Sequence, residues 1–560
     1  MGIGTVLLQR GLISRAQLED ALGEQRRTGE RLDRVLVRMG FVTREQVLEA
    51  IGEQFHMPVV DLTTMVVEAK VLKQLPARLV HRQNCVPIAQ ANGTLTVATS
   101  DPFEISVLDE LRLLAGCSID LVLADEEDLH KFIRLNYGVG SDTLDEMSAG
   151  LEAEPALDPA TAEEVEQAQE ASVIKLVNDI IIEAMNERST DVHIEPYEKE
   201  LVVRYRIDGI LQRANVPPTI NRFGAAIISR IKIMANLNIA EKRTPQDGRI
   251  SFRRRTREHG LEEYDLRVSV IPMLSGEGVV LRILNKSAVT LTLDDLGMPG
   301  TVFSVWDEII RRPHGIVLVT GPTGSGKSTT LYASMNQIVS DEVKVITIED
   351  PVEYQVAGIN QIQVNDKVGL TFATGLRSIL RHDPDVVLVG EIRDKETAET
   401  AVQASLTGHL VFSTLHTNDA PGAITRLLDM GVEPFLVSSS VEGVLAQRLV
   451  RRICTECGQA YTPDPADIPP GLKLGRDQTL MRGAGCRSCR NTGYRGRIGI
   501  YEILVITDNT REMIMQRINA PVIAKRAEED GDLLSLIDDG YAKVRAGVTT
   551  IGEVMRSVKA

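Results

Sequence analysis

Apolar and polar positions repeat at the start of the chain. The first copy, Gly11-Leu12-Ile13 with Gln17-Leu18, recurs 29 residues later (11 to 40) as Gly40-Phe41-Val42 with Gln46-Val47. Each copy predicts a helix that ends at glycine, a short turn, and a second amphipathic helix with its N-cap at Ser14 or Thr43. The pattern therefore predicts a tandem helical repeat over residues 1–58.

The pattern changes twice in the next hundred residues. Residues 59–137 predict a small α/β unit, with a strand at Leu95-Thr96-Val97-Ala98. Residues 141–170 then contain ten Asp or Glu residues, no Lys or Arg and no aromatic residue. Such a segment buries too little apolar surface to offset its ordering entropy, and like charges extend it. We therefore predict an acidic flexible linker over residues 138–170, with a few helical turns allowed in 161–170.

Regular periodicity returns after the linker. Apolar residues at helical spacing predict an amphipathic helix over Ser172–Glu187. The short alternating strands that follow are Val192–Ile194, Leu201–Ile207, Ile250–Phe252, Tyr264–Ser269 and Val279–Leu284. This order predicts an α+β domain over 171–287. From 288 to 560 strands and helices alternate, which indicates an α/β domain with a mostly parallel sheet covered by helices.

Composition supports a soluble, intracellular chain of several domains. The 560 residues suffice for three or four domains at about 100–200 residues each. No apolar run reaches the roughly 18 residues of a membrane span, and Met1-Gly2-Ile3-Gly4 lacks a basic region for export. The net charge of −16 argues against nucleic acid as a partner, although ten negative charges lie in the linker and −6 remains elsewhere. We expect a cytoplasmic protein.

One segment matches the phosphate-binding pattern G-x-x-x-x-G-K-[ST] without a mismatch. Its residues, with the one that follows, are Gly321, Pro322, Thr323, Gly324, Ser325, Gly326, Lys327, Ser328 and Thr329. A predicted strand, Ile316–Val319, enters the loop, and a predicted helix over 329–339 leaves it. Glycines let backbone N–H groups face phosphate oxygens, Lys327 would reach the β- and γ-phosphates, and Ser328 would bind Mg²⁺. The sequence predicts a nucleoside triphosphate site.

Carboxylates follow the next two predicted strands. Glu349, Asp350 and Glu353 come after Val343–Ile348, and Glu391 comes after the strand over 385–389. Open α/β sheets bind ligands at this C-terminal edge of their strands. Each carboxylate could be a solvated strand end or a ligand for metal or water, and for Glu349 and Asp350 the two interpretations are equally balanced.

Four of the six cysteines are spaced as metal ligands. Cys454 and Cys457 form one C-x-x-C pair and Cys486 and Cys489 a second, with 28 residues (458–485) between the pairs. Four thiolates in this pattern can hold one Zn²⁺, and without an open position such a site is structural. Redox-active or merely exposed thiols are the alternative. We expect a zinc-binding insert over about 450–495.

Several stretches, in the same order, resemble the family of type II secretion and type IV pilus assembly ATPases. Residues 349–354 (EDPVEY) resemble its aspartate box and residues 407–416 (TGHLVFSTLH) its histidine box. The upstream stretches 241–249 (EKRTPQDGR), 265–269 (DLRVS) and 276–282 (GEGVVLR) also resemble the family. The resemblance covers roughly residues 171–505, and the zinc pattern favours the assembly branch over the retraction ATPases.

The resemblance implies a fold and a set of residue roles. It implies a RecA-like P-loop motor domain, a preceding PAS-like α+β domain and a separate N-terminal helical and α+β domain. Glu353 would orient the attacking water, and Glu391 would lie near Mg²⁺ at the Walker B end. His409 and His416 would sense the γ-phosphate, although a structural histidine is the alternative for each.

Two further arginines gain a role only from the resemblance. Arg267 and Arg282 lie on predicted strands, and the matching arginines of the family reach the nucleotide as arginine fingers. Salt bridges on the strand surface are the alternative.

The N-terminal repeat resembles a duplicated domain that binds cyclic-di-GMP in some members of the family. The family pattern opens each copy with Arg-Leu-Gly, whereas this chain has Gly2-Ile3-Gly4 and Arg31-Leu32-Asp33. We therefore favour a docking domain for an inner-membrane partner over a nucleotide sensor.

The resemblance predicts a cytoplasmic homohexameric Mg-ATPase that powers assembly of a type II secretion pseudopilus or a type IV pilus. Its partners would be an inner-membrane platform protein and a membrane-bound docking protein. Two alternatives remain: a conjugation-type motor that translocates nucleic acid, and a regulatory module that senses cyclic-di-GMP.

Overall fold

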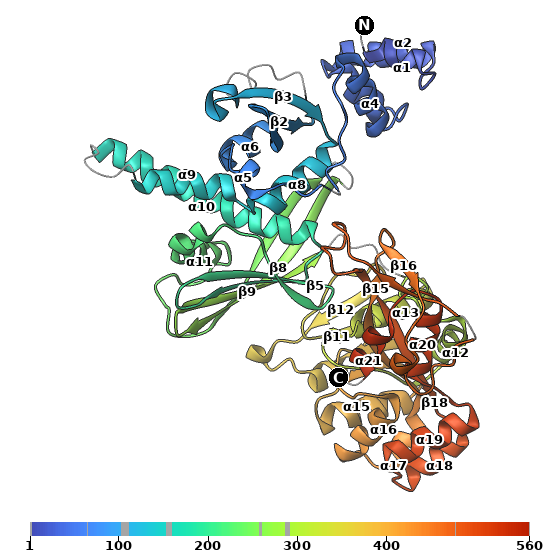
Figure 1. Cartoon of the computed structure of the whole chain (residues 1–560). Coiled ribbons are helices and arrows are strands. Elements are labelled where there is room, and N and C mark those ends of the chain that lie inside the picture. The colour runs from blue at the N-terminus through green and yellow to red at the C-terminus, as the bar shows by residue number, and fades with distance from the viewer. Residues whose placement is uncertain are drawn as a thin grey trace. The chain divides into compact units, whose positions relative to one another are not determined.

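The computed structural model describes residues 3–63, 65–101, 111–152, 159–256, 260–285, 292–475 and 478–558 (Figure 1). The chain forms two compact units, one of Met1–Phe252 with Asp265–Ile283 and one of Arg253–Tyr264 with Leu284–Ala560. Among the described residues, no helix combines the length and the apolar composition that a membrane span needs.

The residues of the predicted tandem repeat form four helices: α1 (Ile3–Gln9), α2 (Arg15–Thr28), α3 (Leu32–Arg38) and α4 (Arg44–Phe55). The Ser14 hydroxyl accepts a hydrogen bond from the Gln17 N–H at 3.2 Å, and Thr43 does the same for Gln46 at 3.2 Å. Both are capping boxes, in which the glutamine side chain bonds back to the cap. The two copies thus fold by the same local rule.

A small α/β unit follows the repeat. Its elements are α5 (Ala69–Leu72), α6 (Ala77–Gln83), β1 (Cys85–Ala91), β2 (Thr94–Thr99), β3 (Ser118–Leu123) and α8 (Glu126–Tyr137). β2, which contains the predicted strand at 95–98, runs antiparallel to β1 and parallel to β3. The buried side chains of α6 and α8 join those of the sheet in one apolar core.

The structure differs from the predicted acidic linker. The helices α9 (Ser141–Glu152) and α10 (Pro159–Asn186) occupy most of this stretch, and its residues 153–158 lie outside the described residues. Leu144 and Met147 of α9 are buried, and the Asp142 carboxylate is 2.6 Å from the Lys175 ammonium of α10. Apolar side chains three positions apart share one helix face, so a short packed helix forms despite the acidic composition.

A six-stranded sheet in the order β6-β5-β4-β9-β8-β7 belongs to the first unit, except for residues 253–264 of β7 and β8 and the end of β9, which are grouped with the second. Its elements are β4 (Asp191–Pro196), β5 (Leu201–Ile207), β6 (Ile210–Arg213), the 3₁₀ helix η1 (Pro218–Phe223), α11 (Gly224–Met234), β7 (Gln246–Thr256), β8 (Gly260–Met273) and β9 (Gly276–Asn285). All five predicted strands lie within it. The helix α10 lies along this sheet, where the Tyr205 hydroxyl donates to the Ile180 carbonyl at 3.1 Å (Figure 1).

The second unit is built on an eight-stranded sheet in the order β12-β11-β13-β14-β10-β15-β18-β19. Its first half contains α12 (Gly300–Ile310), β10 (Gly315–Thr320), α13 (Lys327–Ile338), β11 (Val345–Glu349), β12 (Ile359–Gln363), η2 (Asp366–Val368), α14 (Phe372–Ile379), β13 (Val386–Val389), α15 (Lys395–Leu406) and β14 (Leu410–Leu415). These strands are all parallel, as predicted.

The rest of this unit continues the sheet and adds a helical cluster. It contains α16 (Ala420–Asp429), α17 (Pro434–Ser440), β15 (Val441–Ile453), β16 (Gly458–Tyr461), η3 (Pro465–Asp467), β17 (Leu480–Gly483), β18 (Tyr494–Val505), α18 (Asp508–Met515), α19 (Ala520–Asp530), β19 (Leu533–Leu534), α20 (Leu536–Arg545) and α21 (Ile551–Val558). β15 is parallel to β10, whereas β18 and β19 are antiparallel additions.

The central strand β10 is buried on both faces. Ile316 and Leu318 pack into the apolar core that contains side chains of α14, α15 and α16. Val317 and Val319 point to the opposite core, which contains side chains of α12 and α13. Because helices cover both faces, the loop after β10 is held at the C-terminal edge of a rigid sheet.

Candidate functional site

The predicted phosphate-binding loop joins β10 to α13. Gly321, Gly324 and Gly326 have φ angles of 148, 80 and 92°. A Cβ atom on Gly321 would lie 2.6 Å from the Gln447 carbonyl oxygen, and one on Gly326 would lie 2.8 Å from Gln447 Nε2. Only glycine allows this close backbone approach, which leaves the loop N–H groups free to turn toward an anion.

The loop has donors for phosphate oxygens. The Lys327 Nζ donates to the carbonyl oxygens of Gly321 and Pro322 at 2.8 and 3.1 Å, and burial lowers the pKa of this ammonium to about 8. The Ser325 hydroxyl is buried and has no hydrogen-bond partner among the described residues. Ser328 is exposed in the first turn of α13. A buried hydroxyl and a lysine over the loop fit the oxygens of a triphosphate, which accept from both.

Two of the predicted site residues meet at the same edge of the sheet. Glu391 follows β13 and His416 follows β14, and His416 Nε2 lies 3.2 Å from Glu391 Oε2. The Arg393 guanidinium donates to the other oxygen of Glu391. Burial raises the pKa of Glu391, but Arg393 and His416 outweigh it and hold the pKa below its usual value. Glu391 also acts on Lys327, since its charge raises the pKa of that ammonium.

His409 lies elsewhere. It precedes β14, and its carbonyl accepts from the N–H of Gly315 at the first residue of β10. Its Nδ1 lies 2.9 Å from the Ala404 carbonyl oxygen. Because β10 has six residues at roughly 3.3 Å each, His409 is roughly 20 Å along the strands from its own chain's phosphate-binding loop. The structure does not bring His409 to that loop, unlike the role implied by the resemblance.

The predicted carboxylates after β11 differ in their surroundings. Glu349 is buried, and its oxygens accept from Tyr332 of α13 and from the Thr347 hydroxyl at 2.6 Å. Its carboxylate is thus held as a structural anchor by two hydroxyl donors, which favours a structural role over a metal ligand. Asp350 is exposed, with Arg393 at 3.9 Å.

Glu353 is held near α13 by its neighbour. The Tyr354 ring meets the Tyr332 ring edge-on, with the centroids 4.6 Å apart. Tyr332 lies in the helix that leaves the phosphate-binding loop, so the segment that carries the half-buried Glu353 is packed against that helix. This contact places Glu353 on the side of the sheet that the loop also occupies.

Arg267 and Arg282 line one cavity of 510 Å³ in the first unit. They lie on the adjacent strands β8 and β9. Arg282 Nε donates to Asp191 Oδ1 at 3.0 Å, which is the strand-surface salt bridge expected as the alternative. The cavity nevertheless gives both arginines access to a ligand.

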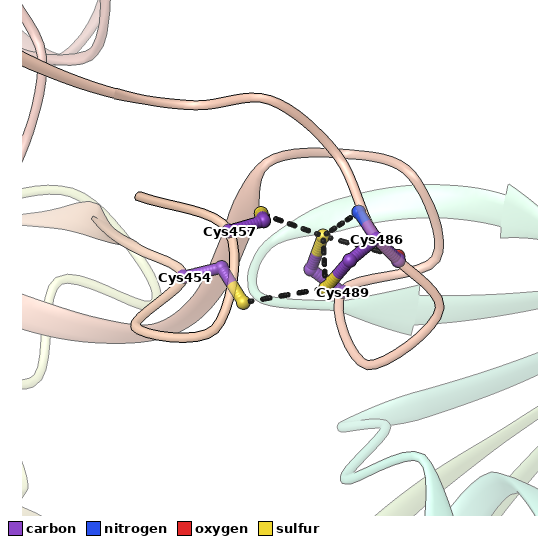
Figure 2. A group of neighbouring side chains, drawn as sticks. All are labelled: Cys454, Cys457, Cys486 and Cys489. Carbon is purple, nitrogen blue, oxygen red and sulfur yellow. Dashed lines mark hydrogen bonds between the residues drawn. The ribbon is translucent and has the colours of Figure 1, made fainter. Parts of the chain in front are cut away.

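The four predicted cysteine ligands come together where β15 ends and β18 begins (Figure 2). The sulfur atoms lie 3.8 Å apart for Cys454 and Cys486, 3.8 Å for Cys457 and Cys489, and 3.7 Å for Cys486 and Cys489. Four sulfurs placed tetrahedrally about 2.3 Å from one Zn²⁺ would be about 3.8 Å apart, whereas a disulfide joins sulfurs at about 2.05 Å. The spacing fits a shared metal ion.

Backbone donors support the same interpretation. The N–H groups of Cys486 and Gly493 donate to Cys489 Sγ at 3.1 and 3.2 Å. Such donors stabilise a thiolate, the form in which cysteine binds a metal. β15 and β18 are antiparallel neighbours, so the cysteines that follow β15 lie beside those that precede β18, although Cys454 and Cys486 are 32 positions apart in sequence.

Sequence reasoning missed Arg448, a buried charge near the loop. Arg448 lies in β15, only 4% exposed, and its Nη2 donates to the Asn418 carbonyl at 2.8 Å. Among the described residues no carboxylate lies within 4.0 Å of it, and burial lowers the pKa of its guanidinium. Its signal in the sequence is the polar pair Gln447-Arg448, which interrupts the apolar residues of the run 444–450. It bonds the segment after His416 through Asn418 and lies beside Gly321, where a Cβ atom would be 3.2 Å from Arg448 Nη1.

Two family models match the chain. The model described as type II/IV secretion system protein matches residues 166–556, and the model described as MshEN domain matches residues 55–142. The first match contains the phosphate-binding loop, both groups of carboxylates, the arginine cavity and the four cysteines. The second begins where the tandem repeat ends.

Known relatives extend the match over nearly the whole chain. The type IV pilus assembly ATPase PilB of Myxococcus xanthus is 41% identical over 563 residues, which cover 99% of this chain and 98% of that protein. The type II secretion system protein E of Pseudomonas aeruginosa is 45% identical over 507 residues, covering 89% and 99%. The solved structure of the Legionella pneumophila ATPase DotB covers 68% of this chain and 94% of its own, with a TM-score of 0.50 at 20% identity, a likeness of fold.

Proposed function

Because the chain belongs to the type II/IV secretion system protein family of ATPases, we propose that it is a homohexamer whose ATP hydrolysis drives assembly of a type IV pilus or a type II secretion pseudopilus. The observation that carries this proposal is the sequence identity of 41% and 45% to one protein of each kind, over 99% and 89% of this chain. One relative is named for each system, so the proposal covers both.

The nucleotide site would lie in a RecA-like domain over residues 288–560. Residues 321–329 would cradle the phosphates, with Lys327 at the β- and γ-phosphates. Ser328 and Glu391 would hold Mg²⁺, which when bound neutralises charge on the phosphate oxygens. His416 would orient Glu391 through the 3.2 Å contact between them.

Glu353 would orient the attacking water. Its support is the anchoring of the segment 349–354 to α13 through Tyr332 and Tyr354. A packed neighbouring ring fixes the backbone from which the Glu353 carboxylate projects, as the positioning of a water-orienting group requires.

The arginines would act from a PAS-like domain over residues 171–287. Arg267 and Arg282 of one copy would contact the triphosphate of a neighbouring copy as arginine fingers, and their shared cavity supports this. Catalysis would then depend on how domains of adjacent copies are placed, so each hydrolysis step would move them as rigid bodies.

The cysteines would hold one structural Zn²⁺. The donor set is complete with four sulfurs, so no position remains open for a catalytic water. The metal would brace the ends of β15 and β18, the strand pair beside β10.

The N-terminal residues 1–137, with the small α/β unit over 59–137, would dock the ATPase on the membrane machinery. The protein would be cytoplasmic and peripheral, bound to a platform protein and a docking protein of the inner membrane. Arg31, the single arginine that matches the cyclic-di-GMP pattern, bonds Asp33 at 2.9 Å and Asp101 at 2.5 Å. These carboxylates compete with a phosphate, which favours docking over the sensing of cyclic-di-GMP.

Purified full-length protein tests this function. We expect MgATP hydrolysis that Lys327→Ala abolishes, and binding to the cytoplasmic domain of the platform protein encoded beside the pilin or pseudopilin genes. Stimulation of turnover by DNA without platform binding would support a nucleic-acid motor instead. Heat on titration of the full chain with cyclic-di-GMP would support the regulatory alternative.

A further inference from the structure

A third arginine lines the cavity of Arg267 and Arg282. It is Arg249 of β7, at the edge of the sheet order β9-β8-β7. It ends the stretch 241–249, which resembles the family but has no role in the site described above. Three adjacent strands thus each contribute one guanidinium to one cavity.

Arg249 adds a positive charge to the cavity that no nearby carboxylate neutralises among the described residues. Arg282 is paired with Asp191 at 3.0 Å. Arg249 is exposed, and among the described residues no carboxylate lies within 4.0 Å of it. Asp247 is the one acidic residue among the described residues of the cavity wall, and Asp191 pairs with Arg282 from beside it, so the three guanidiniums still outnumber these two carboxylates. The excess of positive charge, in a hollow of 510 Å³, fits a polyanion of ligand size.

The backbone under Arg249 is held in place before any ligand binds. A Cβ atom on Gly248 would lie 2.6 Å from the Ala235 carbonyl oxygen at the end of α11, so only glycine fits there. The Gln246 side chain donates to the carbonyls of Asn238 and Glu241 at 3.0 and 2.9 Å. β7 therefore starts from an anchored position, and the arginine that follows is pre-positioned.

We propose that Arg249 is a third guanidinium contact to the triphosphate of ATP bound by a neighbouring copy, beside Arg267 and Arg282. The proposal rests on the proposed function, since it needs a ring in which one copy presents this cavity to the next copy's nucleotide. A guanidinium offers paired donors that match phosphate oxygens, and a third one adds stabilisation as charge builds during transfer.

The first test compares Arg249→Ala with two reference variants of the full-length protein. Arg267→Ala reports on the proposed function. Arg213→Ala is the control, because Arg213 is an exposed arginine at the opposite edge of the same sheet, paired with Glu200. We expect Arg249→Ala to lower kcat about tenfold or more. Affinity for a non-hydrolysable ATP analogue and Tm should stay unchanged, and Arg213→Ala should behave as wild type.

The second test asks whether the contact crosses between copies. The Arg249→Ala protein is mixed with the Lys327→Ala protein, so that rings containing both variants assemble. A Lys327→Ala copy supplies an intact Arg249 to a neighbour whose own phosphate-binding loop is intact, so we expect turnover above that of either protein alone. Arg267→Ala mixed with Lys327→Ala serves as the parallel arm.

The outcomes separate the two proposals. Wild-type turnover for Arg249→Ala with a loss for Arg267→Ala overturns the role of Arg249 and leaves the proposed function intact. Wild-type turnover for both overturns the arginine-finger mechanism itself. A lowered Tm with weakened analogue binding would assign Arg249 to folding and overturn the inference. The inference would also be overturned if turnover recovered in the mixture of Arg267→Ala with Lys327→Ala but not in the mixture of Arg249→Ala with Lys327→Ala.

Discussion

His416 Nε2 lies 3.2 Å from Glu391 Oε2, although the two residues are 25 positions apart in sequence. They meet because β13 and β14 are adjacent parallel strands, and each residue follows the C-terminal end of its strand. The contact joins a predicted metal ligand to a predicted γ-phosphate sensor. The imidazole also affects the ionisation of the carboxylate, since His416 contributes to the lowered pKa of Glu391.

The amide Glu391→Gln should abolish turnover and preserve nucleotide binding. It keeps the size of the side chain but removes the charge that would hold Mg²⁺ beside Lys327. We expect a loss of kcat of roughly 10³-fold, consistent with removal of a group that stabilises phosphoryl transfer. Steady-state hydrolysis and binding of a fluorescent analogue measure the two effects. Turnover within tenfold of wild type would remove Glu391 from the site.

Replacing His416 by Ala should shift the acid limb of the pH–rate profile. Glu391 has a lowered pKa, so its carboxylate is ionised above that value and turnover is lost as pH falls through it. Without His416 the pKa of Glu391 rises toward its usual range, and the acid limb moves to higher pH. His382→Ala, which changes an exposed histidine, is the control and should leave the profile unmoved. If the acid limb of His416→Ala stays where it is in the wild type, His416 does not control the ionisation of Glu391.

Much of this site could be predicted from the sequence because its chemistry is local. Residues 321–328 need only a strand before them, a helix after them and glycines where side chains would collide, and all three are visible in the sequence. The cysteine pairs are equally local, since two C-x-x-C knuckles carry their ligands at fixed spacing. The sequence pattern does not show which strands pair, and it is this pairing that brings the two C-x-x-C pairs together.

Other features depended on packing that no single segment reveals. The role of Glu349 is set by Tyr332, seventeen positions away on α13, and not by its own neighbours. The acidic stretch was expected to be a flexible linker, yet Leu144 finds a buried position because another helix covers it. His409 shares a motif with His416 but lies at the other end of β14, since a six-residue strand separates them.

Nucleotide affinity should weaken as pH rises through about 8. Burial lowers the pKa of Lys327 to about 8 in the free protein, so its charge is progressively lost above that pH. A neutral amine attracts the phosphates less, and a bound triphosphate must restore the proton. Analogue binding measured between pH 7 and pH 10 should show a falling affinity with a midpoint near 8. Lys327→Arg, which stays charged, should flatten that dependence, and an equal decline in both proteins would exclude Lys327 as its source.

Replacing Cys457 by Ser should release the metal. Three thiolates bind Zn²⁺ far less tightly than four, and structural zinc contributes about 10–16 kcal/mol to small domains. We expect zinc content near one ion per chain in the wild type, little in the variant, and a lower Tm. Cys117→Ser changes a half-buried cysteine outside the cluster and should retain the zinc. Equal metal content in both variants would refute the four-cysteine site.

Replacing Leu144 by Ala should release α9 from the first unit. Leu144 is fully buried, and removal of a buried leucine side chain costs about 2–5 kcal/mol. We expect proteases to cleave residues 138–152 slowly in the wild type and at least several-fold faster in the variant, because a packed helix must open before it is cut. Leu135→Ala, at a 48% exposed leucine of α8, is the matched control and should keep the wild-type rate. Rapid cleavage of this stretch in the wild type would contradict the packed helix and support the predicted flexible linker.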